Sequence, residues 1–304
     1  MDFAFEPPLP PGRELYRFAT VNDVHIGEEG FGRPFKIREG DDVEPYPARC
    51  LRAALAEAKA WGAQRILAKG DLTDHSHEEE FVWFAAVVGD AGIETNAILG
   101  NHDIRDEDVD GAAVLRRRGV DVSSRARAID VPGLRIVMLP SLLDFHVGQW
   151  TDDDRAEVIR LARETDAPVF VATHHYPQRN NSPIEFPPGI KARNANLLLD
   201  ALDEAAPGSV VACGHTHRHH RRHHKSLLIT EIGSTKDFPG VWAGYRVFEG
   251  GITQTVHKIQ EPSARAWIDR SGSAVFGAWR YWAPGLRTHR NWTWEWPASR
   301  RRSV

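Results

Sequence analysis

Five short segments of this sequence carry side chains that could hold metal ions and move protons. They are Asp23-Val24-His25, Gly70-Asp71-Leu72-Thr73-Asp74, Gly100-Asn101-His102-Asp103, His174-His175 and Gly214-His215-Thr216-His217. A pair of catalytic cations needs bridging oxygen, several imidazole ligands, and open positions for water and substrate. The segments offer that set and leave one histidine over for proton transfer.

The spacing within these segments favours shared ligation. Asp23 and His25 stand two positions apart, and so do His215 and His217. Side chains two positions apart on an extended chain point the same way. Asp71 is the natural carboxylate to bridge two ions, whereas an asparagine can contribute only its amide oxygen, a weak ligand that suits a site of nearly balanced charge.

The elements that must position these residues alternate between short apolar runs and amphipathic segments, the pattern of a layered α/β domain. The apolar runs predict strands at Leu15–Val24, Ile66–Lys69, Ala97–Leu99, Arg135–Leu139, Val169–Thr173, Val210–Cys213 and Leu227–Ile232. Helices are predicted at Pro47–Trp61, Glu78–Val88, Asp152–Arg163 and Asn194–Ala205. Asp71, Asn101, His174 and His215 each come at the end of such a strand, where loops gather and sites are built. We therefore expect these side chains to converge.

Length and composition disfavour several classes of protein. The chain has 304 residues, of which 41% are hydrophobic and 26% charged, as in one large α/β domain or two modest ones. A formal net charge of −4 provides no basic field for nucleic acid. We find no apolar run of roughly eighteen residues and no secretory leader, so neither a membrane span nor export is expected. Cys50 and Cys213 do not suggest a disulfide scaffold, and we expect a cytoplasmic protein.

In their order, the five segments resemble the motifs of the calcineurin-like metallophosphoesterase superfamily: Asp-x-His, Gly-Asp, Gly-Asn-His-Asp, His and Gly-His-x-His. The resemblance covers about Tyr16 to Ile259. Each motif alone is weak, but five in register are specific. The resemblance implies a four-layer αββα sandwich, with two mixed β-sheets flanked by helices and a Trp-rich C-terminal extension. The corresponding division is an arm at 1–14, the metallophosphoesterase domain at 15–260 and the extension at 261–304.

The resemblance also implies a ligand set for two metal ions. One ion would be held by Asp23, His25, Asp71 and His217, and the other by Asp71, Asn101, His215 and either His174 or His175. The family's preference for a ligand two residues before a proline favours His175, whereas counting outward from the strand favours His174. The sequence does not decide between His174 and His175, and we slightly favour His175. Manganese, iron, zinc and cobalt all suit such ligands.

His102 is implied to assist the leaving group rather than to bind metal. In the family, the equivalent histidine approaches the leaving oxygen and is oriented by the carboxylate three residues after the bridging aspartate, which is Asp74 here. An imidazolium fixed by a carboxylate can stabilise or protonate a departing alkoxide. The nucleophile would be a hydroxide bridging the two ions, because metal binding lowers the pKa of water towards about 7.

The motif details favour one branch of the family. Protein serine/threonine phosphatases carry Arg-Gly where His75-Ser76 follows Asp74, so that branch is disfavoured. Simple bacterial phosphodiesterases share the Gly-Asp-Leu-Thr-Asp, His-His and Gly-His-Thr-His-Arg segments. They hydrolyse cyclic nucleotides, glycerophosphodiesters or aryl phosphodiesters, so we expect a small organic phosphodiester as substrate. The alternatives are a phosphomonoesterase or nuclease on the same centre, and a metal-bound interaction module without turnover.

Three further features lie outside the ligand set. Arg218, next to His217, is a candidate substrate contact, and so is His146, although its surroundings predict a loop. The basic run Arg218–Lys225 is expected to form the solvated turn between paired strands. The tryptophan-rich tail is expected to pack over the domain or against another subunit. In the second case the protein would be a homo-oligomer.

Overall fold

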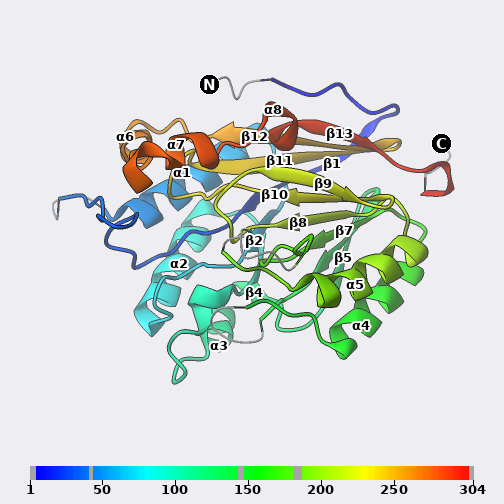
Figure 1. Cartoon of the computed structure of the whole chain (residues 1–304), viewed down its shortest axis with the longest axis horizontal. Coiled ribbons are helices and arrows are strands. Elements are labelled where there is room, and N and C mark those ends of the chain that lie inside the picture. Colours follow the sequence, from blue (N-terminus) through cyan, green and yellow to red (C-terminus); the bar gives the residue numbers. More distant parts are fainter. Residues whose placement is uncertain (1–4, 41–43, 143–146, 181–186, 301–304) are drawn as a thin grey trace.

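Two mixed β-sheets lie face to face, with helices on their outer sides (Figure 1). The structure, a computed structural model, describes residues 5–40, 44–142, 147–180 and 187–300. Three apolar clusters fill the spaces between the first helical layer and its sheet, between the two sheets, and between the second sheet and its helices. The predicted four-layer αββα architecture is confirmed.

The first sheet has seven strands in the order β13-β12-β11-β1-β2-β3-β4. These strands are β1 (Glu14–Val21), β2 (Ile66–Lys69), β3 (Thr95–Ile98), β4 (Asp121–Val122), β11 (Val241–Phe248), β12 (Gly251–Lys258) and β13 (Trp292–Glu295). Strands β1 to β4 run parallel to one another, and β11 to β13 extend the sheet with antiparallel pairs. The carboxyl ends of β1, β2 and β3 therefore share one edge.

The second sheet has six strands in the order β5-β6-β7-β8-β10-β9. They are β5 (Arg127–Val131), β6 (Leu134–Met138), β7 (Val169–Ala172), β8 (Val210–Cys213), β9 (His220–His224) and β10 (Leu227–Glu231). Strands β6, β7, β8 and β10 are parallel, so their carboxyl ends also share an edge.

The prediction of a turn over the whole of Arg218–Lys225 is wrong, because His220–His224 forms the edge strand β9, paired with β10. Only the link between the two strands turns, beginning at Lys225, whose φ is 51°. Charged side chains suit an edge strand, since they discourage pairing with another chain.

An aromatic cluster joins the two sheets. Phe18 of β1 stacks on Tyr245 of β11 at 4.8 Å between ring centres, and both rings meet Phe170 of β7 nearly edge-on, at 5.1 and 5.0 Å. Such offset and T-shaped pairs contribute about 0.5–1.5 kcal/mol each beyond their buried area. The three rings belong to the apolar core between the two sheets.

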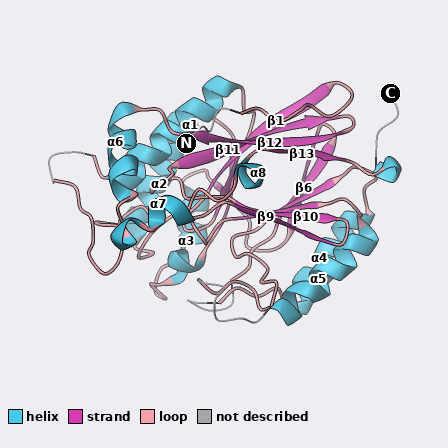
Figure 2. Ribbon diagram, turned by 45° about the horizontal axis from the view of Figure 1, so that its top comes forward, coloured by secondary structure: helices cyan, strands magenta, loops and turns pink. Residues whose placement is uncertain are grey.

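The helices cover the outer faces of the two sheets (Figure 2). The first sheet is covered by α1 (Tyr46–Trp61), α2 (Glu78–Ala91), α3 (Gly111–Arg117) and α6 (Pro262–Ser271), and the second by α4 (Asp152–Arg163) and α5 (Ala192–Ala205). Short helices are η1 (Asn101–Ile104), η2 (Val275–Gly277), α7 (Trp279–Trp282), α8 (Arg287–Arg290) and η3 (Ala298–Arg300).

Local signals explain where these helices begin and end. Helix α1 ends at Gly62, which takes the left-handed conformation with φ of 97°. Helix α4 begins with a capping box, in which Thr151 and Asp154 bond reciprocally to each other's backbone N–H at 2.9 and 3.1 Å. Such a cap stabilises a helix by about 1 kcal/mol.

The C-terminal segment is built into the fold. Trp267 of α6 stacks on Tyr46 of α1 at 3.7 Å, and β13 pairs with β12 at the edge of the first sheet. Both contacts pack this segment against the domain. Cys50 and Cys213 are both buried and free, and among the described residues no helix is long and apolar enough to cross a membrane.

Candidate metal centre

The polar motifs meet where the carboxyl ends of both sheets come together. Asp23 and His25 follow β1, Asp71 follows β2, His174 follows β7 and His215 follows β8. Backbone hydrogen bonds tie the loops together: the N–H groups of Val24 and His25 donate to the carbonyl of Asp71, and that of Gly214 donates to the carbonyl of His174. The predicted convergence is therefore observed.

Several of these residues hold a strained backbone. Asp23, His25, Asp71, His215 and His217 all have positive φ, between 50° and 71°. A left-handed conformation costs an L-residue roughly 1–2 kcal/mol. Strain of this kind persists where surrounding contacts over-determine the conformation, and it clusters at functional sites.

Two groups of side chains bring possible metal-ligand atoms close together, and the first consists of Asp23, His25 and His217. Nε2 of His25 lies 3.3 Å from Nε2 of His217, which is 3.7 Å from Oδ1 of Asp23. Each imidazole turns its other nitrogen to a carboxylate: His25 Nδ1 to Asp74 at 3.1 Å, and His217 Nδ1 to Asp237 at 2.7 Å. When both rings are neutral, two lone pairs face each other, an arrangement that a cation stabilises.

The second group contains His174, His175 and His215. Nε2 of His174 lies 3.2 Å from the amide oxygen of Asn101, and its Nδ1 donates to the carbonyl of Lys69 at 2.8 Å. His175 shares its Nδ1 hydrogen bond with Ser141, while its buried Nε2 has no partner among the described residues. A buried nitrogen without a partner fits a ligand position.

Asp71 lies between the two groups. Its Oδ2 is 3.6 Å from Nε2 of His25, and its Oδ1 is 3.4 Å from Nε2 of His174. Burial alone would raise the pKa of this carboxyl, but His174, His102 and His25 hold it well below its usual range. The group is therefore a carboxylate with one oxygen towards each set of imidazoles.

Three of the buried histidines have protonation states that fit metal binding, whereas, against the effect of burial, the facing carboxylates raise the pKa of the other two, that of His174 to about 9 through Asp71 and that of His217 through Asp237 and Asp23. Burial lowers the pKa of His25, His175 and His215, the last to about 3, and neighbouring imidazoles lower each further. These rings are neutral at pH 7 and present lone pairs, as metal ligands must. The donor set of imidazoles, carboxylates and one amide suits a pair of borderline cations.

His102 and Asp74 lie beside the first group. Oδ1 of Asp74 accepts from Nδ1 of His102 at 2.8 Å as well as from His25. The backbone N–H of His102 donates to Asp71 at 2.9 Å, which ties its loop to the centre. Arg105, which sequence reasoning missed, donates to Nε2 of His102 at 2.9 Å and to the carbonyl of Asp74 at 2.8 Å.

Asp103, the last residue of the Gly-Asn-His-Asp motif, was given no role of its own from the sequence. Its buried carboxylate accepts the backbone N–H groups of Gly100, Leu72 and Thr73 at 2.7, 3.1 and 2.7 Å. Burial and the neighbouring Asp71 raise its pKa to about 6, against these hydrogen bonds. Asp103 therefore fastens the Asn101 loop to the Asp71 loop.

Of the two predicted substrate contacts, Arg218 and His146, the structure describes only Arg218. The guanidinium of Arg218 lies 4.6 Å from the ring of Trp282, and its Nε donates to Glu231 at 3.3 Å. Arg218 thus stands beside His217 with its side chain held between a carboxylate and an indole. His146 lies outside the described residues.

The fold and the site together define an α/β protein with a histidine and carboxylate centre at the joined ends of two sheets. The sequence profile of the family described as Calcineurin-like phosphoesterase matches residues 16–219. The chain belongs to this family.

Two curated relatives are each 26% identical to the chain. One is the 3',5'-cyclic adenosine monophosphate phosphodiesterase CpdA of Pseudomonas aeruginosa, aligned over 175 residues, and the other a probable cyclic nucleotide phosphodiesterase of Psychrobacter arcticus, aligned over 176. The alignments cover 56% of this chain and 60% and 62% of the relatives, so the chain spans about three fifths of their length.

Solved structures share the fold at low identity. A dimetal phosphatase from Danio rerio has a TM-score of 0.63 at 14% identity, over 82% of this chain and 98% of that one. The purple acid phosphatase PPD1 from yellow lupin seeds has a TM-score of 0.60 at 10% identity, over 83% of this chain and 53% of that one. At these identities the likeness concerns the fold alone.

Proposed function

We propose that this protein is a metal-dependent phosphoesterase that hydrolyses a small organic phosphodiester. The observation that carries the proposal is the position of Asp71, whose two oxygens face His25 on one side and His174 on the other. Family membership supports phosphoester hydrolysis, and the names of the two relatives favour a cyclic nucleotide or similar diester.

We assign the two ions to the two groups of ligand atoms. One ion would be held by Asp23, His25, Asp71 and His217, and the other by Asp71, Asn101, His174 and His215, an assignment that leaves out His175 of the second group. The sequence slightly favoured His175, but we now prefer His174 as the ligand. Nε2 of His174 faces both Asn101 and Asp71. The ring centre of His175 lies 4.8 Å from that of His174 and 4.5 Å from that of His215.

The bound ions would supply Lewis acidity towards the phosphate and a hydroxide at neutral pH. The protein's own contribution to departure of the leaving group is His102, held by Asp74 through Nδ1. Nε2 of His102 is the atom that would contact the leaving oxygen. That nitrogen now accepts from the guanidinium of Arg105, so the leaving oxygen would replace Arg105 as its partner. Arg105 is a cation beside His102 and would balance phosphate charge there, whereas Arg218 is already paired with Glu231.

The test compares two aryl phosphates with Mn²⁺ present. Faster hydrolysis of bis(p-nitrophenyl) phosphate than of p-nitrophenyl phosphate supports the diesterase, and the reverse order supports a monoesterase. Failure to hydrolyse either would overturn the proposal and favour an interaction module. Cyclic nucleotides and glycerophosphodiesters, assayed next, would identify the substrate, and elemental analysis of the purified protein would identify the metals.

A further inference from the structure

A carboxylate that no sequence motif marks, Asp237, joins the metal centre to the C-terminal segment. It lies after β10, is fully buried, and accepts from Nδ1 of His217 through its Oδ2 at 2.7 Å. Its other oxygen, Oδ1, accepts the indole N–H of Trp279 at 3.0 Å. Trp279 begins α7, 42 residues further along the chain.

A buried lysine completes the surroundings of Asp237. Nζ of Lys236 lies 3.1 Å from Oδ2 of Asp237 and 2.6 Å from Glu28, and it stands 4.3 Å from the ring of Phe31. Both oxygens of Asp237 are therefore occupied. A buried carboxylate held on both sides cannot rotate without leaving a donor unpaired, which costs about 1–3 kcal/mol.

Two aromatic rings enclose the imidazole that Asp237 holds. The ring of Phe31 stacks on His217 with 10° between planes and 6.3 Å between centres. The Trp279 ring lies 6.3 Å from His217 at 69° and 5.6 Å from Phe31. His217 is thus fixed in its plane by Phe31 and in its rotation by Asp237, with Nε2 towards Asp23 and His25.

We propose that Trp279 is a positioning residue of the metal centre. Its N–H fixes one oxygen of Asp237, so that the other oxygen holds His217 with Nε2 aimed at the first group of ligand atoms. Partners that orient a ligating histidine typically change metal affinity 10–100-fold when removed. The proposal rests on His217 being a metal ligand, and it makes the segment after Pro262 necessary for tight binding of one of the two ions.

The test is Trp279→Phe, which keeps an aromatic ring and removes the N–H. Trp242→Phe is the matched control, because Trp242 also donates its indole N–H to a carboxylate, Glu57, at 3.2 Å but has no link to His217. We would strip both variants and the natural protein with a chelator and titrate them with Mn²⁺ by calorimetry. We expect one of the two binding steps to weaken about 10-fold or more in Trp279→Phe only.

Three further measurements separate positioning from general structural damage. Trp279→Phe should keep the thermal unfolding midpoint of its metal-free form within the range of the control, and its kcat should recover at saturating Mn²⁺. Asp237→Asn, which keeps the side-chain shape, should weaken the same binding step at least as much. Equal Mn²⁺ affinity in Trp279→Phe and Trp242→Phe would overturn this inference alone, whereas natural protein that binds no Mn²⁺ would overturn the proposed function as well.

Discussion

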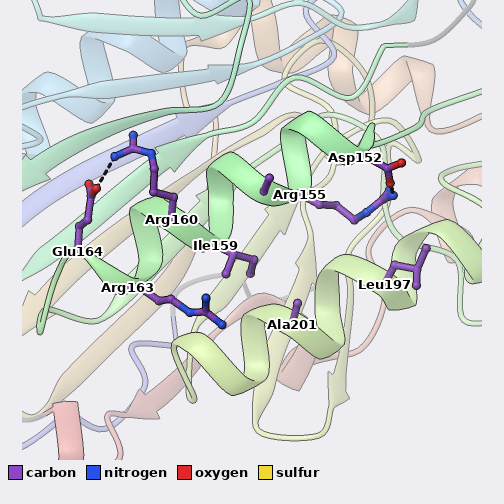
Figure 3. A pocket seen from close by; sticks show the side chains of 9 residues that line it. Asp152, Arg155, Ile159, Arg160, Arg163, Glu164, Leu197 and Ala201 are labelled. Atoms are coloured by element: carbon purple, nitrogen blue, oxygen red, sulfur yellow. Dashed lines mark hydrogen bonds and ion pairs between the residues drawn. The ribbon is translucent and has the colours of Figure 1, made fainter.

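The metal centre and the groove between α4 and α5 use the same kinds of charged side chain with opposite results. The groove is lined by Asp152, Arg155, Ala156, Ile159, Arg160, Arg163, Glu164, Leu197 and Ala201 (Figure 3). Its charges pair with neighbours three or four positions away in α4 or at its C-terminal cap: Arg155 with Asp152, and Arg160 with Glu157 and Glu164. At the metal centre, the partners come from strand ends up to 192 residues apart.

A hollow surface is therefore a weaker sign of function than buried polar side chains brought together from distant parts of the chain. In the groove, ion pairs one helical turn apart lie in water, where they contribute little. At the centre, most of the site residues are buried, five of them have a strained backbone, and Nε2 of His25 faces Nε2 of His217 at 3.3 Å. Backbone strain and buried polar groups of this kind cluster at functional sites.

The largest expected effect is that of Asp71→Asn. Replacement of one carboxylate oxygen by an NH₂ group removes a negative charge shared by both groups of imidazoles, so we expect turnover of the aryl diester to fall by about 10³-fold or more. The measurement is kcat with Mn²⁺ added back. Asp152→Asn, the same change in the groove, should stay within about twofold of the natural protein. Near-normal turnover in Asp71→Asn would refute the bridge.

His102→Ala should reveal the proton-transfer role through the leaving group. General acid assistance contributes about 10²–10⁴-fold when the leaving oxygen is basic, and less when it departs easily as a phenolate. We expect a large loss of kcat/KM on a diester with an alkyl leaving group and a much smaller loss on bis(p-nitrophenyl) phosphate. Equal losses on both substrates would show that His102 acts elsewhere.

The main strands and helices that carry the metal centre and the groove could be predicted from the sequence. The apolar runs Ile66–Lys69 and Val210–Cys213 coincide with β2 and β8, and Asp152–Arg163 coincides with α4. Such short buried runs and capped helices are local signals, so the chain itself marks them. The ligand candidates could be predicted as well, since they follow those strands directly.

The supporting residues could not be recognised by their own type. Asp103, Arg105 and Asp237 act by contacting loops that are distant in sequence. Asp103 stands within a recognised motif that does not reveal this contact, and Arg105 and Asp237 are an isolated arginine and aspartate that carry no sign of it. One signal was present for Asp237, which ends the polar run Ser234-Thr235-Lys236-Asp237 just after an apolar strand. The edge strand β9 was missed because its sequence is as polar as a turn.

Backbone strain gives a third and smaller test. His217 has φ of 53°, so glycine should be tolerated better there than alanine. We expect metal-free His217→Gly to be about 1 kcal/mol more stable to urea than His217→Ala, although both lack the imidazole. In the groove the order should reverse: Ala201→Gly, inside α5, should lose about 1 kcal/mol. If glycine is worse at both positions, the strain at the centre is not real.

The smallest expected effect is that of Arg160→Ala in the groove. Its partners Glu157 and Glu164 lie on the same helix and are solvated, so their charges remain hydrated when the guanidinium is removed. We expect kcat/KM within about twofold of the natural protein and an unfolding midpoint shifted by less than about 2 °C. Glu157→Gln is the companion variant, with the same expectation. A tenfold loss of turnover in either would mean that the groove takes part in catalysis, and the contrast between the two regions would fail.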